Sequence, residues 1–412
     1  MRVLIIGEGG RESAIATKLH QDSRITKMFF AKGNATTEKI GTNIPETSVE
    51  GLRNFAKKEQ IDLTIVGPEA PLVHGIVDEF NAHGLKIFGA KQRAANLEGS
   101  KAYSKKFMKD YGIKTAQAEI FDSYEKAQTY IKKQSFPLVI KASGLASGKG
   151  VVICDNLEVA EATVHDFMIR RIHGDAGIQI VVEEFLQGFE ASIIGFSNGD
   201  QIFPCVSVKD YKQVGNGDTG PNTGGMGTVA PNPYFTDEHF ADFQQHILTP
   251  TLNGLKEELL TFKGFIFFGL MVTKKGTYLL EYNMRMGDPE TQVILPLMEN
   301  KLLDVILDCL DGKEVELKFQ DKKAVCLVMC SGGYPRNIET GYEITGLDKV
   351  KNSEVLFAGA AYRKDRIITT GGRVLNLVSV ADSYEEAREQ VYEDAYTINF
   401  DYGFYRDDIG KF

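Results

Sequence analysis

Short apolar runs alternate with amphipathic stretches along the first hundred residues. The apolar runs are VLIIG (3–7), KMFFA (27–31), LTIVG (63–67) and IFGA (87–90). Between them, RESAIATKLH (11–20) and PLVHGIVDEF (71–80) have the spacing of helices that bury one face. Alternating strands and helices with short connections predict a parallel α/β sheet. The sites of such sheets lie at the carboxyl ends of the strands.

Glycine-bearing turns follow three of these strands. They are Gly7-Glu8-Gly9-Gly10-Arg11, Gly33-Asn34 and Gly67-Pro68-Glu69-Ala70-Pro71. The first resembles the dinucleotide fingerprint G-x-G-x-x-G, but Glu12 replaces the third glycine. The second strand ends in lysine instead of an acid, which argues against nicotinamide binding. Each turn alone could simply close a tight connection. Together, with Arg11 beside backbone N–H groups, they indicate a phosphate or sugar site.

A second region begins near Ser100, which caps a predicted helix that ends at Gly112. Lys101 and Lys105 share one face of this helix, a spacing that usually reflects solvated charge. Beyond it, strand patterns dominate 136–194, helical patterns appear near 232–261, and after residue 312 the chain is mostly β, with a helix at 383–396.

The stretch LVIKASGLASGKGVVI (138–153) places a glycine-rich turn between two apolar runs. It is not a P-loop, because its glycines are too closely spaced and Gly150 stands where Ser or Thr should be. Since Val151 and its neighbours favour a strand, we predict a β-hairpin whose tip covers a bound phosphate. Lys141 and Lys149 would add point charges to the backbone donors. An ordinary hairpin with exposed lysines is the alternative.

Glu183 and Glu184 end the next predicted strand, in IVVEEFLQGFEAS. The residues that follow could bind an adenine edge through their backbone, and Glu190 could bind ribose hydroxyls. Acids at a strand end are usually just solvated. Their position after a phosphate hairpin favours the nucleotide interpretation.

The strand in TYLLEYNMRMGDPETQ (277–292) has one apolar and one polar face. A period of two places Leu280, Tyr282 and Met284 on one side, and Glu281, Asn283 and Arg285 on the other. A carboxylate and an amide oxygen two positions apart suit Mg²⁺, and the arginine could pair with a nearby carboxylate or phosphate. A half-exposed strand with one polar face is the alternative.

Residues 209–233 contain six glycines and three prolines, which argues against regular structure. A loop this long is usually a functional lid or disordered. Asp210 and Lys212, at its entrance, would face the reaction centre.

The composition of the chain argues against several classes of function. The chain has 412 residues, too many for one core, and a net charge of -9, which argues against a nucleic-acid surface. Its longest apolar run, 264–272, is about half of a membrane span. The five cysteines form no C-x-x-C pair and lie beside apolar residues, as buried, reduced thiols do. We expect a cytoplasmic protein, a monomer without nucleic-acid or membrane partners.

These segments, in this order, resemble the ATP-grasp superfamily and, within it, the glycinamide ribonucleotide synthetase family. The resemblance spans nearly the whole chain, and DTGPNTGGMG together with GDPETQ is its most specific part. The motifs that carry it are GEGGRESA (7–14), LTIVGPEAPL (63–72), LEGSKAYSKKFM (97–108), GLASGKGV (144–151), EEFLQGFEAS (183–192), DTGPNTGGMG (218–227), EYNMRMGDPETQ (281–292) and TTGGRV (369–374).

The resemblance implies a multidomain α/β and α+β architecture. We place an N-terminal parallel α/β substrate domain at 1–100, an ATP-grasp clamp of two subdomains at 101–311 with a nucleotide flap at about 116–190, and a small, mostly β C-terminal domain at 312–412. The reaction it implies is activation of the glycine carboxylate by ATP, with Mg²⁺ or Mn²⁺, followed by displacement of phosphate by the amine of 5-phosphoribosylamine. The product is glycinamide ribonucleotide, in purine biosynthesis.

The resemblance also assigns site residues. ATP would contact Lys105, Lys141, Gly144, Ser147, Gly148, Lys149, Gly150, Glu183, Glu184, Leu186 and Glu190. The metal would bind Glu281 and Asn283. Arg285, Asp210 and Lys212 would act in catalysis, and glycine would lie near Asp210, Arg285, Gly372 and Arg373. Phosphoribosylamine would contact Gly10, Arg11, Asn34, Gly67 and Glu69.

The chain departs from the family pattern at Ser13, Ser143, Tyr211 and Gln213, but not at the metal pair or the hairpin glycines. Two other functions are open: another ATP-grasp enzyme, such as a biotin-dependent or purine carboxylase, and a nucleotide-binding sensor without turnover.

Overall fold

The computed structural model describes residues 1–146 and 150–412. The first region forms the predicted parallel sheet, in which apolar β1 is central and buried. Its spatial order is β3 (Thr42–Ile44), β2 (Lys27–Lys32), β1 (Arg2–Gly7), β4 (Leu63–Val66) and β5 (Ile87–Phe88). The connecting helices are α1 (Gly10–His20), α2 (Ala35–Ile40), α3 (Val49–Lys58), α4 (Glu69–Val73), α5 (Ile76–Ala82) and α6 (Gln92–Gly99).

The predicted hairpin at 138–153 is confirmed. Strands β7 (Leu138–Ala142) and β8 (Val151–Cys154) pair antiparallel, with Lys141 opposite Val151. Within the strand-rich stretch, however, α9 (Leu157–Met168) packs its apolar side on these strands, a helix that the sequence analysis missed. The other elements of this flap are β6 (Ala118–Phe121), β9 (Ile180–Glu184) and α8 (Tyr124–Ile131).

A second antiparallel sheet faces the flap and carries the acidic strand. Its order is β11 (Ile202–Pro204), β10 (Phe189–Asn198), β16 (Lys263–Thr273) and β17 (Gly276–Asn283). The adjoining helices are α7 (Lys101–Asp110), α10 (Asp237–Phe243) and α11 (Thr249–Glu257). Ser100 accepts a hydrogen bond from the Tyr103 amide and caps α7 as predicted, and Gly112 follows its end in the left-handed region.

Buried and pocket-facing side chains alternate at the end of β17 as predicted, but Leu280 breaks the predicted pattern. Tyr282 and Met284 are 2% and 1% exposed, as expected for a core face. Between Leu279 and Glu281 the ladder shifts register, so Leu280 is the extra residue of a β-bulge and lines the pocket described below. A bulge resets which side chains point inward, and period-two reasoning cannot detect one.

The third sheet joins distant parts of the chain. Its order is β12 (Lys209–Asp210), β15 (Gly227–Ala230), β18 (Lys323–Cys330), β22 (Arg373–Ala381) and β19 (Glu354–Phe357). Helices α12 (Thr291–Leu297) and α14 (Tyr384–Ala395) pack on it, whereas α13 (Leu302–Leu310) contacts β10, β16 and α1. The C-terminal region also contains the hairpin of β20 (Ala360–Arg363) and β21 (Arg366–Thr369). The helix predicted at 383–396 is therefore confirmed.

The prediction that 209–233 lacks regular structure was wrong. Besides β12 and β15, the segment forms a hairpin of β13 (Gln213–Gly215) and β14 (Thr219–Asn222). The reason is that β15 pairs with β18, about a hundred residues later, and so gains backbone partners that no local pattern reveals.

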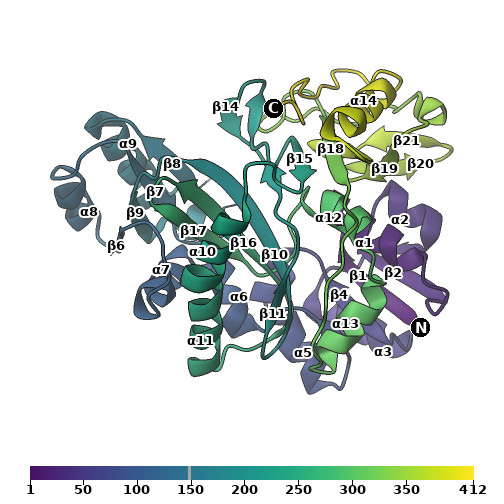
Figure 1. Ribbon diagram of the computed structural model, residues 1–412, viewed down its shortest axis with the longest axis horizontal. Coiled ribbons are helices and arrows are strands. Elements are labelled where there is room, and N and C mark those ends of the chain that lie inside the picture. Colours follow the sequence, from purple (N-terminus) through teal and green to yellow (C-terminus); the bar gives the residue numbers. More distant parts are fainter. Residues whose placement is uncertain (147–149) are drawn as a thin grey trace.

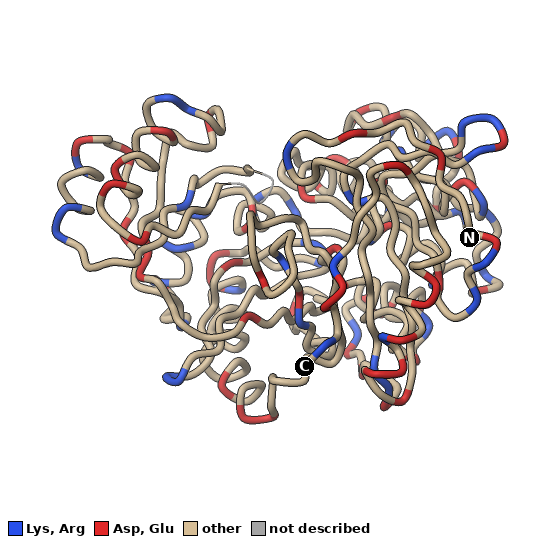
Figure 2. The backbone as a smooth tube through the Cα atoms, turned by 90° about the horizontal axis from the view of Figure 1, so that it is seen from above, with Lys and Arg blue, Asp and Glu red and all other residues tan. Residues whose placement is uncertain are grey.

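The flap projects at one side of the molecule, and the N-terminal and C-terminal regions lie together on the other, with β10, β16 and β17 between them (Figure 1). Basic and acidic residues are interspersed over the described chain (Figure 2). In that same part, no helix is long and apolar enough to cross a membrane. All five cysteines are free and buried, as predicted.

Candidate active site

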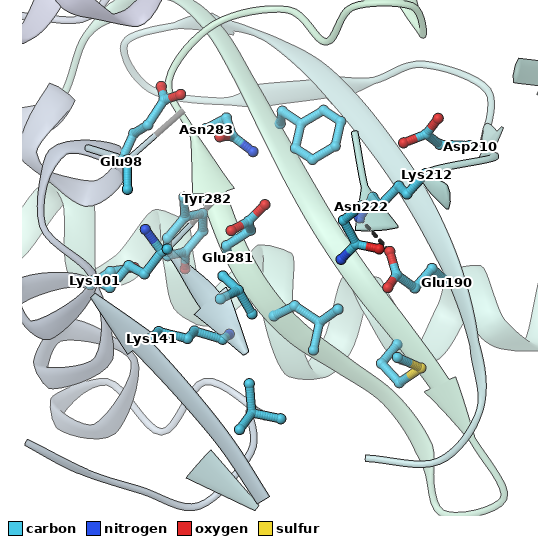
Figure 3. A pocket seen from close by; sticks show the side chains of 18 of the residues that line it. Glu98, Lys101, Lys141, Glu190, Asp210, Lys212, Asn222, Glu281, Tyr282 and Asn283 are labelled. Carbon is cyan, nitrogen blue, oxygen red and sulfur yellow. Dashed lines mark hydrogen bonds and ion pairs between the residues drawn. The ribbon is translucent and has the colours of Figure 1, made fainter. Parts of the chain in front are cut away.

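A pocket of about 570 Å³ lies between the flap, β17 and the start of the 209–233 segment. Figure 3 shows Lys101 and Lys141 on one side of it, Glu281 on the strand between, and Asp210, Lys212 and Glu190 on the other side. Cationic and anionic side chains therefore face each other across one cavity.

Two lysines at the base of the flap share one carboxylate. The ammonium groups of Lys105 and Lys141 lie 3.2 and 2.9 Å from the Glu183 oxygens, and all three side chains are less than 10% exposed. Burial lowers the pKa of Lys105 to about 8, although Glu183 opposes this shift. Burial acts to raise the pKa of Glu183, but Lys141 and Lys105 outweigh it and the net shift is downward. Two cations held by one anion leave positive charge for a phosphate.

Lys101 is a third lysine on this side of the pocket, and we call Lys101, Lys105 and Lys141 the lysine bank. Its side chain lines the pocket with that of Lys105 one turn later. Solvated charge, the usual explanation of this spacing, does not hold for the pair, because both side chains line the pocket. The Lys101 ammonium has one long contact, 3.5 Å to the Gly144 carbonyl.

The acidic strand supplies oxygen ligands in the middle of the pocket. Glu281 and Asn283 both line it, and none of the described residues donates a hydrogen bond to the Glu281 carboxylate. Burial acts to raise the pKa of Glu281, but Lys212, Lys141 and Lys101 lower it overall. The carboxylate is thus held ionised among cations and remains free to bind a metal.

Arg285 follows β17 and is clamped by two acids. Its Nη2 lies 2.9 Å from Glu98 Oε1, and its Nε lies 3.5 Å from Glu69 Oε2. Burial raises the pKa of Glu98, even with the arginine beside it. Nη2 also donates to Asn283 Oδ1, at 3.2 Å, so the arginine links the end of β17 to the N-terminal region.

Asp210 and Glu290 form an acidic pair opposite the lysine bank. Asp210 Oδ1 is buried and has no hydrogen-bond partner among the described residues. Burial, and next the charge of Glu290, raise the pKa of Asp210, and burial also raises that of Glu290. Lys212 contacts Glu190 nearby (Figure 3). An unpartnered carboxyl beside a second one favours binding of an ammonium group.

Arginines and an aspartate form the wall next to the N-terminal sheet. The Arg11 amide donates to Asp288 Oδ2, at 3.1 Å, and Arg373 Nη2 lies 3.5 Å from Asp288 Oδ1. Burial acts to raise the pKa of Asp288, but Arg373 and Arg11 lower it overall. The Arg373 guanidinium also donates to the Gly224 carbonyl, at 2.6 Å.

Comparison with known proteins decides the family. Residues 1–98, 99–291 and 324–412 match the phosphoribosylglycinamide synthetase N domain, ATP-grasp (A) domain and C domain, respectively. The chain belongs to the phosphoribosylglycinamide synthetase family. It is 50% identical to the phosphoribosylamine–glycine ligase of Fusobacterium nucleatum over 100% of this chain and 98% of that protein.

Solved structures agree with this family. The phosphoribosylamine–glycine ligase of Thermotoga maritima has 36% identity and a TM-score of 0.88, covering 99% of this chain and 100% of that one. Biotin carboxylase from Campylobacter jejuni, with 13% identity and a TM-score of 0.76, covers 97% of this chain and 91% of that one. At that identity the likeness shows the fold alone. The resemblance found in the sequence is thus confirmed.

The structure brings most of the predicted site residues to this pocket of the synthetase. Those lining it are Arg11, Glu69, Lys105, Lys141, Gly150, Glu183, Glu184, Leu186, Glu190, Asp210, Lys212, Glu281, Asn283, Arg285 and Arg373. Ser147, Gly148 and Lys149 lie outside the described residues.

Five other predicted residues do not line the pocket: Gly10, Asn34, Gly67, Gly144 and Gly372. Asn34 is 3% exposed, and its amide donates to the carbonyls of Glu8 and Phe357, both at 2.9 Å. It joins the N-terminal turn to the C-terminal region. At Gly67, an added Cβ would lie 1.8 Å from Glu12 Oε1, so this turn requires glycine for close packing.

Four charged residues that line the pocket were not assigned from the sequence: Glu98, Lys101, Asp288 and Glu290. Each lies inside a motif that the family resemblance rests on, although none is adjacent in sequence to a residue that was assigned. The available signal was therefore membership of a motif, but which carboxylates point inward depends on turns after β17 and on α6.

Proposed function

We propose that this chain is a phosphoribosylamine–glycine ligase, which uses ATP to join glycine to 5-phosphoribosylamine. The observation that carries the proposal is the division of one pocket into a lysine bank, a pair of metal-binding oxygens and an acidic pair. These match, in turn, the phosphates of ATP, their divalent cation and the ammonium group of an amino acid. The products of the proposed reaction are glycinamide ribonucleotide, ADP and phosphate.

The chemistry needs an activated carboxyl group, because a carboxylate is a poor acyl donor. An oxygen of the glycine carboxylate attacks the γ-phosphorus of ATP, ADP leaves, and glycyl phosphate forms. The amine nitrogen of phosphoribosylamine then attacks the carbonyl carbon, inorganic phosphate leaves, and the nitrogen loses a proton. No side-chain nucleophile is required. Catalysis therefore depends on positioning and on stabilising charge.

We assign ATP to the side of the pocket formed by the flap. Lys105 and Lys141 would bind the phosphates under the hairpin turn, which includes Gly144 and Gly150. Glu183 holds both lysines in place, since its two oxygens are 3.2 and 2.9 Å from their ammonium groups. The nucleoside would lie along Glu184, Leu186 and Glu190, at the end of β9. We assign Ser147, Gly148 and Lys149 to the phosphates as well.

The residues on β17 fit a divalent cation of the magnesium type. Glu281 and Asn283 offer hard oxygen donors. The described residues contain no group of three or more His, Cys, Asp or Glu side chains that could hold a metal ion. Mg²⁺ commonly binds one or two protein oxygens together with waters and substrate phosphates, so two donors suffice. When bound, Mg²⁺ or Mn²⁺ supplies charge neutralisation at the phosphates. Glu281 and Asn283 would hold it there.

We assign glycine to the space between Asp210 and Arg285. The carboxyl pair of Asp210 and Glu290 would accept its ammonium group, and Arg285 its carboxylate, with Lys212 nearby. Arg373 and Gly372 form the adjoining wall, where Arg373 holds the Gly224 carbonyl at 2.6 Å.

Phosphoribosylamine would bind toward the N-terminal sheet. Arg11 and Glu69 face the pocket there. Gly10, Asn34 and Gly67 would shape the turns that carry these side chains. We also propose a cytoplasmic location, supported by five free and buried cysteines.

The decisive experiment measures ADP release by the purified protein with ATP, Mg²⁺, glycine and freshly generated phosphoribosylamine. We expect release only when both glycine and the amine are present, and no release when bicarbonate replaces glycine. Release with bicarbonate would favour the carboxylase alternative. Tight ATP binding without release under any pairing of carboxylate and amine would favour a nucleotide sensor.

Lys105 makes nucleotide binding dependent on pH. Since its pKa is lowered to about 8, it loses its charge as the pH rises through 8, and a cation at the phosphates is lost. We expect the Kd for ADP to rise by on the order of tenfold between pH 7 and 9, as the charged fraction falls. Isothermal titration at fixed Mg²⁺ measures this. Lys105→Arg stays charged and should give a flat profile, and a flat profile in the unmodified protein would contradict the assignment.

A further inference from the structure

The hairpin of β13 and β14 stands beside residues 405–412, which close the ordered C-terminal region (Figure 1). The hairpin leads directly to Asn222 and Thr223, which line the pocket, and it follows Asp210 and Lys212, which line it too. Its four β14 residues are exposed, so its own core cannot hold it in place. Something else must fix its position.

Arg406 makes that connection. It is 1% exposed, and its Nη1 donates to the Gln213 carbonyl and to Asp218 Oδ1, both at 2.9 Å, one on β13 and the other in the turn before β14. Its Nε and Nη2 are both 2.7 Å from the two Asp408 oxygens. A guanidinium that binds three groups in fixed directions orients them more tightly than one flexible contact would.

The same guanidinium stacks on Tyr211, with its Cζ 5.1 Å from the ring centroid. Tyr211 lies between Asp210 and Lys212, and its side chain is 4% exposed in the C-terminal core, while those of its neighbours face the pocket. Its hydroxyl accepts a hydrogen bond from the Gly410 amide, at 3.2 Å. Fixing the tyrosine therefore fixes the residues on either side of it.

We call Arg406 and residues 407–412 the clasp. Backbone amides make further contacts between the clasp and the hairpin. The Asp407 amide donates to Asn216 Oδ1, at 3.1 Å, and the Gly217 amide donates to Asp408 Oδ2, at 2.8 Å. The clasp is itself anchored, because Tyr392 of α14 donates to the Arg406 carbonyl, at 2.7 Å, and accepts from the Ile409 amide, at 3.0 Å. A series of hydrogen bonds and a cation–π contact thus links α14, through Arg406 and Tyr211, to the residues that line the pocket.

We propose that Arg406 is a positioning residue for the glycine side of the site: it holds the β13–β14 hairpin and Tyr211 so that Asp210, Lys212 and Asn222 stay in place. The proposal rests on the proposed function, because glycine is the substrate assigned to these residues. The flap, which is assigned to ATP, has no contact with Arg406 among the described residues. The clasp therefore acts first on the glycine side, and its link to the residues assigned to ATP is the indirect one through the Lys212–Glu190 ion pair.

The test compares Arg406→Gln with Arg406→Lys and with Arg366→Gln. Arg366 is an exposed arginine of the same region, paired with Glu343, and should behave as the unmodified protein does. In Arg406→Gln we expect the KM for glycine to rise by on the order of tenfold, with the KM for ATP within about twofold. Amide exchange at 213–222, measured without substrates, should become at least about tenfold faster. Arg406→Lys should restore part of both.

Unchanged exchange at 213–222 with an unchanged glycine KM would overturn the proposal. Acceleration spread evenly along the chain, or equal changes in both KM values, would also overturn it, because either indicates a general loss of stability. If Arg406→Gln does not fold, Tyr211→Phe removes only the contact with the Gly410 amide. This variant should also raise the glycine KM more than the ATP KM and speed exchange at 213–222, both by smaller factors. If neither change is selective, the clasp is refuted. Absence of ligation by the unmodified protein would refute the proposed function, while the exchange data would still judge the clasp.

Discussion

Replacing Glu281 with alanine is expected to lower turnover at least about a hundredfold, the scale of removing one group that stabilises transition-state charge. The carboxylate lies on β17, with Lys101 and Lys141 on one side and Asp210 on the other (Figure 3). Lys212, Lys141 and Lys101 keep its pKa low despite burial, so it is ionised at neutral pH. Its loss removes one of two protein oxygens available to a divalent cation at this position. Steady-state ADP release under saturating substrates measures the effect.

Two further variants separate the metal role from a general charge effect. Glu281→Gln keeps an oxygen but loses the charge, so we expect it to need more Mg²⁺ and to recover part of its turnover when Mg²⁺ is raised. Asn283→Asp adds a charge at the same site and should bind ADP more tightly in the presence of Mg²⁺. Near-normal turnover in Glu281→Ala would remove the metal role and, with it, the arrangement proposed for the phosphates.

Replacing Arg285 with methionine is expected to lower kcat/KM at least about a hundredfold. The guanidinium is assigned to the glycine carboxylate, and it also orients Asn283 through a 3.2 Å hydrogen bond. Arg285→Lys retains the charge but not the planar fork, so it should fall between methionine and arginine. Glycine and ATP dependence of the initial rate measures the effect, and the glycine dependence should change more.

Stability must be checked in the same variants, because Glu98 is only 8% exposed and would lose its charged partner. Removing one member of a buried ion pair can cost about 3 to 5 kcal/mol of folding free energy. The double variant Arg285→Met with Glu98→Gln should regain most of the unfolding free energy, since the buried carboxylate is gone and Glu69, the other partner, is 32% exposed and can be solvated, but it should stay inactive. Recovery of activity along with stability would show that the arginine acts only in folding.

The regular elements could be predicted because their signals are local. The apolar runs at 3–7 and 63–67, and the two apolar runs that flank the glycine-rich turn of 138–153, indicate strands by themselves, and the pairing of β7 with β8 confirms the hairpin. Helix caps are equally local, and Ser100 caps its helix as predicted. For the candidate site, motif resemblance placed most of the residues that line the pocket.

Other features depend on partners far away in the chain. The segment 209–233 appeared to be a loop because glycine and proline disfavour strands, yet β15 gains a full set of partners from β18. Leu280 faces the pocket because a bulge against β16 shifts the ladder. Intrinsic preferences amount to about 1 kcal/mol or less per residue, so pairing with a distant strand can override them.

The sequence by itself determined the alternating strands and helices of the N-terminal region, the hairpin at 138–153 and the family. Only the tertiary structure decided that Lys101 faces the pocket, that Asp210 meets Glu290, and that Arg406 reaches back to Gln213. The physical reason is that periodicity and caps involve neighbours within a few residues. Burial, pKa shifts and buried ion pairs arise from side chains that meet only when the sheets are assembled.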